Sequence, residues 1–271
     1  MCKANYHTHT YRCNHAEGDV DDYVVEARKQ GLVKVGFSEH MPTLDRDFND
    51  PDLHMDRVDL PGYVAKVREA SSRWDDIRVY LGGECDYIPG TSSFYKDVFL
   101  GYYAFEYLML STHFIKSDGS WVMFNKIRSA KEVAEYTDQS IAAMKTGLFD
   151  CMVHPDAFML SYGTWDAQTQ ACSVAIIEAA RDLGVILEMN TKGFRLAGVE
   201  KPEDFHKVLY PNQKFWELAS QIHPLAIYGA DAHKPHLVGN NINLCQQFAH
   251  NLDITLVDLF ESKAALQALD T

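Results

Sequence analysis

Two pairs of metal-binding residue types, each separated by a single residue, stand near opposite ends of the chain. His7 and His9 form the first pair, and Asp231 and His233 form the second. Side chains alternate between the two faces of an extended strand, so both members of a pair point to the same side. Because neutral imidazoles and ionised carboxylates bind divalent metals, each pair predicts part of a metal site.

Further candidate ligands follow other apolar segments of the sequence. Loops after the carboxyl ends of parallel strands meet on one side of an α/β fold, so these residues should converge. Without a cation, so many histidines would repel one another below pH ~6.5. The full predicted set is too large for one ion and suits two or three: His7, His9, His15, His40, Glu84, His113, His154, Asp231 and His233.

Short apolar strands alternate with amphipathic helices along the chain. One helix begins after Asp19 and ends at Gly31, and another has the capping box Ser129 and Glu132 and ends at Gly147. Other helices are predicted from Pro61, from Asp166 to Gly184, from near Pro211, and in the tail 241–271. Strands are predicted before His7 and over 32–37, 78–83, 107–111, 151–153, 185–190 and 225–229. Residues 41–60 and the segment containing Asp118, Gly119 and Trp121 are expected as loops, and 88–101 as a loop or short helix.

This alternation, with seven strands and no break in composition, predicts a single α/β domain over residues 1–271. A closed or distorted barrel is the first choice, and an open doubly wound sheet is the alternative that periodicity leaves open. No Gly-x-Gly-x-x-Gly follows a predicted strand, so a dinucleotide site is not expected.

Composition limits the partners. The net charge of −13 argues against nucleic acid as the main partner. No apolar run approaches ~18 residues, so no membrane span is expected. The six cysteines are scattered and no signal peptide opens the chain, which together predict a cytoplasmic protein with reduced thiols. The oligomeric state is left open by the sequence.

The ligand set resembles the metal motifs of the PHP (polymerase and histidinol phosphatase) superfamily, from residue 5 to about residue 240. Residues 36–42, residues 188–195 and the pair Tyr210-Pro211 are most similar to the monofunctional histidinol-phosphatases. The resemblance implies a distorted (β/α)7 barrel with the metal site at the C-terminal ends of the strands.

The resemblance also implies a trinuclear site holding two or three Zn, Mn or Fe ions. One ion would be bound by His7, His9, Glu84 and Asp231. A second would share Glu84 and add His113 and His154. The third would be bound by His15, His40 and His233.

The activity that the resemblance implies is hydrolysis of a small phosphate monoester by a metal-bound hydroxide. The expected substrate is L-histidinol phosphate, in histidine biosynthesis. Arg195 is a candidate phosphate clamp, because a guanidinium can bind two phosphate oxygens, although it could also be a surface arginine. Lys192 and Arg12 are further substrate-binding candidates. Asp231 or His233 could pass a proton to the leaving group, and Glu39 either orients a metal ligand or is a surface acid.

One departure from the family pattern concerns substrate choice. Histidinol-phosphatases often carry a basic residue shortly after the fifth-motif histidine, and residues 154–160 contain none. A phosphoesterase acting on a nucleotide or sugar phosphate therefore stays open, as does a noncatalytic metal-bearing module. The remaining histidines are predicted to be surface or structural residues: His54, His206, His223, His236 and His250.

Overall fold

A computed structural model of the chain describes residues 3–44, 48 and 50–269. Seven parallel strands form one sheet whose spatial order follows the chain, β1-β2-β3-β4-β7-β8-β9. They are β1 (Ala4–Asn5), β2 (Lys34–His40), β3 (Arg78–Asp86), β4 (Tyr107–Ser111), β7 (Cys151–Met152), β8 (Ile186–Asn190) and β9 (Ala226–Gly229). The strands lie where the sequence predicts them. β2 and β3 continue beyond their predicted ends at residues 37 and 83, so His40 and Glu84 lie within the strands.

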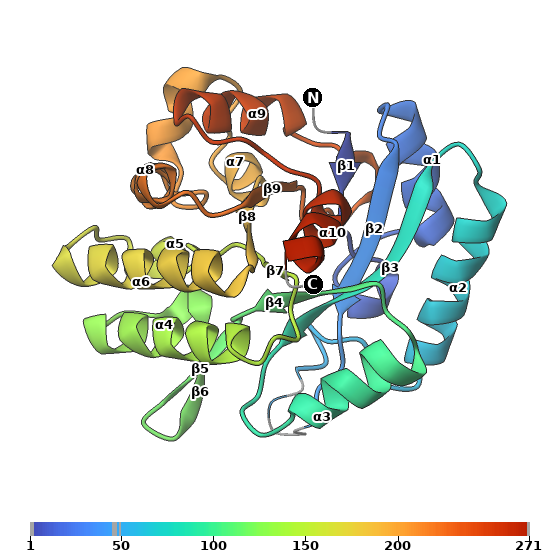
Figure 1. Cartoon of the computed structure of the whole chain (residues 1–271), viewed down its shortest axis with the longest axis horizontal. Coiled ribbons are helices and arrows are strands. Elements are labelled where there is room, and N and C mark those ends of the chain that lie inside the picture. The colour runs from blue at the N-terminus through green and yellow to red at the C-terminus, as the bar shows by residue number, and fades with distance from the viewer. Residues whose placement is uncertain (1–2, 45–47, 49, 270–271) are drawn as a thin grey trace.

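The sheet nearly closes on itself just beyond β1 and β9. Thr8 forms a parallel bridge with Ala232. The His9 N–H donates to the Ala232 carbonyl over 2.9 Å, and the Ala232 N–H donates to the His7 carbonyl over 3.2 Å. Figure 1 shows the strands curving around a common centre with helices outside them. The barrel prediction is therefore confirmed, and the open doubly wound alternative is wrong.

The predicted long helices form the outer layer. They are α1 (Val20–Lys29), α2 (Leu60–Arg73), α4 (Ala130–Met144), α6 (Ala167–Leu183), α8 (Gln213–Ile222) and α9 (Ile242–Asn251). Asp19, Ser129 and Asp166 cap α1, α4 and α6 through reciprocal capping boxes, as their side-chain chemistry favours. Short helices occupy the connections: η1 (Tyr11–Cys13), α3 (Ser92–Phe94), η2 (Tyr95–Tyr102), η3 (Phe124–Lys126), α5 (Met159–Tyr162), α7 (Lys192–Leu196), η4 (Pro202–Lys207) and η5 (Pro235–Leu237).

The segment expected to be a loop around Asp118 is instead an antiparallel hairpin, made of β5 (Phe114–Ser117) and β6 (Ser120–Met123). Asp118 and Gly119 connect the strands, and both have positive φ, at 48° and 82°. This is the backbone that an Asp-Gly hairpin turn adopts, so the signal was present in the sequence.

Aromatic side chains fill the barrel. Tyr107 lies against β2 and β3, where a Cβ at Gly36 or Gly82 would come within 2.3 Å or 2.2 Å of its side chain. The last helix, α10 (Leu259–Leu269), closes the end where the strands begin, and Phe260 stacks on Tyr80 with ring centroids 3.9 Å apart. The opposite end, where the strands finish, carries the predicted ligands.

Within the part of the chain that the structure describes, no helix is both long and apolar enough to cross a bilayer.

Candidate metal centre

Glu84 lies at the centre of the predicted ligands, fully buried at the end of β3. Its Oε2 atom is 3.3 Å from His7 Nε2, 3.4 Å from His9 Nε2 and 3.0 Å from His40 Nδ1. His7 and His9 follow β1, and His40 ends β2, the strand between β1 and β3. One carboxylate oxygen therefore faces three imidazoles.

The other oxygen of Glu84 faces a different pair of ligands. Oε1 is 3.3 Å from His113 Nε2, after β4, and 3.1 Å from His154 Nε2, after β7. The two imidazole rings are close to each other, with centroids 5.1 Å apart. Glu84 is thus placed between two groups of donors, which is the geometry of a bridging carboxylate.

Asp231 and His233, after β9, complete the ring of candidate ligands. Asp231 Oδ1 is 3.9 Å from His7 Nε2, 3.6 Å from His9 Nε2 and 3.1 Å from His233 Nδ1. The exposed His15 side chain reaches His233, with their Nε2 atoms 2.8 Å apart. All nine side chains that the sequence singled out therefore meet at one end of the barrel.

Several ligand atoms gather tightly enough to share an ion. Four sets have donor atoms within 4.8 Å of one another: His7, His9 and Glu84; His40, Glu84 and His113; His15, His40 and His233; and His9, Cys13 and His233. The ring nitrogens of His9 are fully buried and have no hydrogen-bond partner in the structure. A buried imidazole without partners is costly, and a cation among these nitrogen and oxygen donors would remove that cost.

Burial and neighbouring charges shift the pKa values of several residues in the cluster. Burial, aided by neighbouring histidines, lowers the pKa of His40 to about 3. Burial and the nearby Lys192 lower the pKa of His233 to about 4. Burial would raise the pKa of Glu84, but His40 and His113 hold it well below its usual range. At neutral pH Glu84 is therefore a carboxylate and His40 and His233 are neutral imidazoles, the forms that bind metal ions. The pKa values of His7 and His113 shift the other way: burial acts to lower them, but nearby carboxylates raise the pKa of His7 and raise that of His113 to about 8.

Two carboxylates that the sequence did not single out contact candidate ligands on the ring nitrogen that does not face Glu84. Glu188, in β8, lies 2.7 Å from His7 Nδ1, and Asp86 lies 2.9 Å from His113 Nδ1. Gly229 makes room for Glu188, because a Cβ there would lie 1.6 Å from Glu188 Oε1. The sequence feature that could have revealed them is an acidic residue inside an apolar strand, because a buried carboxylate requires a partner.

Glu39 is fully buried, so the expectation of a surface acid is wrong. It accepts hydrogen bonds from the Thr10 N–H over 2.8 Å and the Thr10 hydroxyl over 2.5 Å, and its Oε1 lies 3.5 Å from His9 Nδ1. Burial raises the pKa of Glu39 to about 7, although these hydrogen bonds act to lower it. Glu39 thus supports the turn that carries His9.

The three predicted substrate-binding cations differ in their placement. Arg195 donates to the carbonyls of Ala230 and Asp231 over 2.7 Å and 3.0 Å, at the edge of the ligand ring. Lys192 Nζ lies 3.2 Å from Asp231. Arg12 is buried and paired with Asp19 over 2.6 Å.

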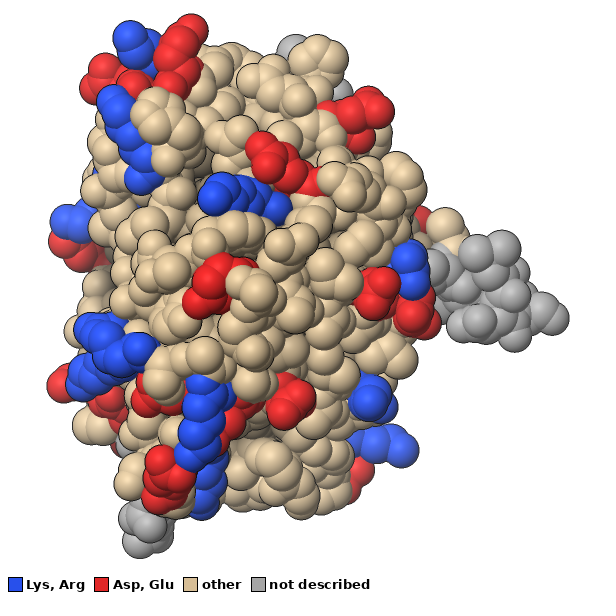
Figure 2. Space-filling view, turned by 90° about the vertical axis from the view of Figure 1, so that its left-hand side faces the viewer, with Lys and Arg blue, Asp and Glu red and all other residues tan. Residues whose placement is uncertain are grey.

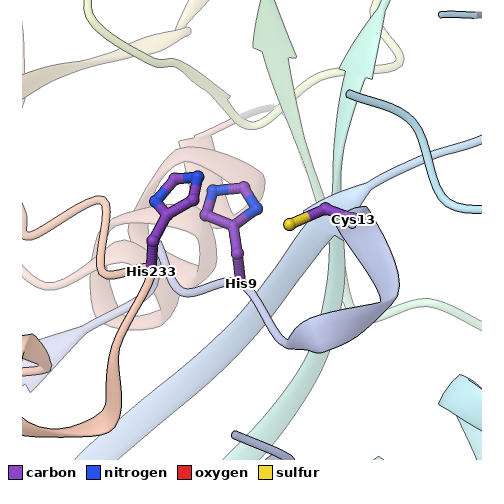
Figure 3. Close-up of side chains that lie close together, drawn as sticks. All are labelled: His9, Cys13 and His233. Atoms are coloured by element: carbon purple, nitrogen blue, oxygen red, sulfur yellow. The ribbon is translucent and has the colours of Figure 1, made fainter. Parts of the chain in front are cut away.

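Cys13 also lies beside the ligands, and the sequence did not single it out. Figure 3 shows its sulfur pointing toward the imidazoles of His9 and His233. The thiol donates to the Thr10 carbonyl over 3.3 Å, and burial raises its pKa.

Two of the ligands have unusual backbone conformations. His154 and Asp231 have positive φ, at 32° and 46°. Non-glycine residues adopt this region rarely, and such residues concentrate at functional sites. In both, the conformation occurs directly after a strand, where the chain turns and the side chain faces the cluster.

Comparisons with known proteins agree with this geometry. The sequence profile of the PHP domain matches residues 5–192. A probable histidinol-phosphatase of Deinococcus radiodurans is 28% identical over 86% of this chain and 87% of its own length. One from Schizosaccharomyces pombe is 26% identical over 94% and 88%. The histidinol phosphate phosphatase of Lactococcus lactis, solved with zinc, L-histidinol and phosphate, has the same fold, with a TM-score of 0.71 and 18% identity over 94% of this chain and 95% of that one.

The matched residues contain seven of the nine predicted ligands, and β9 then brings the other two, Asp231 and His233, to the same ring. A profile match over most of the chain, on a barrel whose strand ends carry that ring, makes this chain a member of the PHP domain family.

Proposed function

We propose that the protein is a metal-dependent phosphoric monoester hydrolase that converts L-histidinol phosphate to L-histidinol and phosphate. The observation that carries the proposal is the shared carboxylate of Glu84, whose two oxygens face two separate groups of imidazoles. Relatives covering most of the chain bear the name histidinol-phosphatase, and the Lactococcus lactis structure contains the two products of that reaction.

Three divalent ions of Zn, Mn or Fe are part of the proposal. The geometry supports the grouping implied by the resemblance, with His15, His40 and His233 for one ion and Glu84 between the other two. His7, His9 and Asp231 would complete the first of those, and His113 and His154 the second. The nitrogen and oxygen donors suit all three metals.

Bound ions would supply positive charge for the phosphoryl oxygens and lower the pKa of a bound water. The chain's own residues would position the ester and handle the proton. Arg195 and Lys192 lie beside Asp231 and would add positive charge for phosphate at the edge of the ring. Asp231 and His233 are 3.1 Å apart, so either could pass a proton to the leaving oxygen.

Arg12 is a weaker part of this proposal. Its guanidinium is occupied by Asp19 and Thr10, and binding a phosphate would require it to leave Asp19. Arg12 is also buried, whereas Arg195 and Lys192 are half-buried at the edge of the ring, and we therefore place phosphate binding on these two first.

A small ester rather than a nucleic acid is the proposed partner. On the face drawn in Figure 2, basic and acidic side chains are interspersed over the described residues, which differs from the continuous basic surface that binds a phosphate backbone. A cytoplasmic location and a role in histidine biosynthesis are also proposed. The free thiols of Cys13, Cys85, Cys151 and Cys172 are consistent with a reducing compartment.

We further propose that residues 1–271 act as one domain. The strands from both ends of the sequence, β1 and β9, lie together, and α10 contacts the barrel that they close.

Phosphate release from a panel of esters tests the substrate. The panel contains L-histidinol phosphate, nucleoside monophosphates and sugar phosphates, each assayed with added Mn²⁺. We expect kcat/KM for L-histidinol phosphate to exceed the others by at least about tenfold, a difference of about 1.4 kcal/mol in transition-state binding. A preference for another ester would support the hydrolase activity and contradict the proposed substrate.

A further inference from the structure

His54 lies between β2 and α2 and is buried, with 2% of its surface exposed. Its ring is flanked by Phe48 and Phe114, at centroid distances of 5.8 Å and 6.3 Å. The other histidines without a predicted metal role, His206, His223, His236 and His250, are exposed. His54 is therefore the buried exception among them, and its hydrogen bonds lead to the metal centre.

Hydrogen bonds fix which nitrogen of His54 carries the proton. The backbone N–H of Asp50 points at His54 Nδ1 over 3.0 Å, and an N–H group can only donate. Nδ1 therefore accepts, and the proton of the neutral ring is on Nε2. Nε2 lies 3.2 Å from Asp86 Oδ2, to which it donates.

Asp86 passes this constraint to a ligand. Its Oδ1 accepts from the His113 backbone N–H over 2.7 Å, and its Oδ2 lies 2.9 Å from His113 Nδ1. The carboxylate can only accept, so His113 Nδ1 carries a proton and Nε2, which faces Glu84, is the nitrogen left to bind an ion. Asp86 Oδ2 therefore accepts two hydrogen bonds, one from His113 Nδ1 and one from His54 Nε2.

The same segment contacts the surroundings of two other ligands. The Met55 N–H donates to the His40 carbonyl over 3.0 Å. The Asn14 side chain, next to His15, donates to the Pro51 carbonyl over 2.8 Å. Residues 50–55 are thus hydrogen-bonded to His40 itself, to the neighbour of His15 and, through Asp86, to His113.

We propose that residues 50–55 brace the metal centre and that His54 is the positioning residue of this brace. His54 acts through Asp86, by fixing the rotamer of the carboxylate that orients His113. The proposal rests on the metal centre proposed above and is independent of which ester is hydrolysed.

Metal binding gives the direct test. The metal-free full chain is titrated with Co²⁺, and the visible absorption bands report affinity and ligand geometry. We expect His54→Phe, which keeps the ring and removes the donor, to weaken Co²⁺ binding at one site or more by about 10-fold and to alter the bands. His54→Gln can place an amide N–H near the position of Nε2, so it should restore most of the affinity.

Ile177→Ala is the matched control, because Ile177 is buried in α6 in the outer layer, away from the ligands. It should lower thermal stability and leave Co²⁺ affinity and absorption unchanged. Wild-type affinity and bands in His54→Phe would overturn the proposal. If His54→Phe does not fold, the comparison is His54→Gln with the shorter His54→Asn, and equal affinity in these two would overturn it.

The outcome is separable from that of the proposed function. If the proposed substrate is wrong, the wild-type protein will bind Co²⁺ but will not hydrolyse L-histidinol phosphate. Failure of the brace would appear as unchanged Co²⁺ binding in the His54 variants.

Discussion

At the scale of single residues, the centre is organised by carboxylates that differ in task. Glu84 faces the ligand nitrogens directly, whereas Glu188, Asp86 and Glu39 lie behind His7, His113 and His9. Acids behind ligating histidines fix the ring orientation and raise ligand basicity. We therefore expect metal affinity to depend on these three acids as well as on the nine candidate ligands.

We predict that Glu188→Gln lowers metal affinity and turnover by about 10- to 100-fold, because the charge behind His7 Nδ1 is lost while the side-chain size is kept. Equilibrium dialysis and kcat/KM measure the two effects. Glu178→Gln, on the exposed side of α6, is the control. Unchanged metal affinity in Glu188→Gln would contradict a positioning role.

Arg195→Ala should lower kcat/KM by about 30- to 150-fold, since a charge-assisted hydrogen bond to phosphate is worth about 2–3 kcal/mol. Inorganic phosphate should also inhibit the variant more weakly, whereas metal content stays the same. Equal inhibition of variant and wild type would assign Arg195 to holding the Ala230 and Asp231 carbonyls alone.

The nine candidate ligands could be brought together from sequence because all of them except His15 lie at or just after the end of an apolar strand, and the fold class places these strand ends at one side. Their supports could not. Glu188 and Asp86 have their partners at the ends of other strands, 181 and 27 residues away in sequence, and no local pattern specifies such pairs. His54 looked like other loop histidines because its burial depends on Phe48 and Phe114.

At the scale of elements, the caps and strand alternation specified the outer helices and the sheet. Closure into a barrel depends on the pairing of Thr8 with Ala232, a contact between the two ends of the sheet that periodicity does not encode. The β5–β6 hairpin was missed although Asp118-Gly119 is a turn signal, because its strands are short and its residues half-buried.

Helix α10 is held to the barrel by Asp258, whose Oδ2 lies 2.9 Å from Lys34 Nζ and 2.8 Å from the Tyr6 hydroxyl. Burial acts to raise the pKa of Asp258, but the hydrogen bonds from Lys34 and Tyr6 lower it. A lowered carboxyl pKa stabilises the fold above its unfolded pKa of ~3.9, and this contribution is lost as the pH falls through the folded value.

Asp258→Asn should therefore reduce the free energy of unfolding by about 1–2 kcal/mol at pH 7, and the gap to wild type should persist to about pH 4 and narrow as the pH falls further. Asparagine retains the oxygen that caps the Phe260 and Glu261 N–H groups, so the variant isolates the charge. Urea unfolding at about pH 7, pH 4 and pH 2.5 measures the gap, and a gap that stays constant below about pH 4 would refute the assignment.

At the scale of the whole molecule, the ligands come from both ends of the chain, from His7 to His233. Ions bound by this proposed set would bind the folded chain more tightly than the unfolded one and so would raise its stability. At a metal concentration about 100 times Kd, each independent site adds about 2.7 kcal/mol.

Removal of metal by a chelator should consequently lower Tm, and Mn²⁺ or Zn²⁺ should restore it. In Glu84→Gln the dependence of Tm on added metal should be weaker, because the shared carboxylate charge is gone. Calorimetry of both proteins, with and without chelator, checks this. An identical metal-dependent shift in the two would place binding elsewhere.

The most direct test of the account is phosphate release from L-histidinol phosphate by metal-free protein as Mn²⁺ is returned to it, for wild type and for Asp231→Asn and His9→Ala. The account predicts that wild type is inactive with chelator and regains turnover with Mn²⁺, while both variants remain folded and lose turnover. Turnover that persists in chelator, or full activity in either variant, would contradict a hydrolase built on this metal centre.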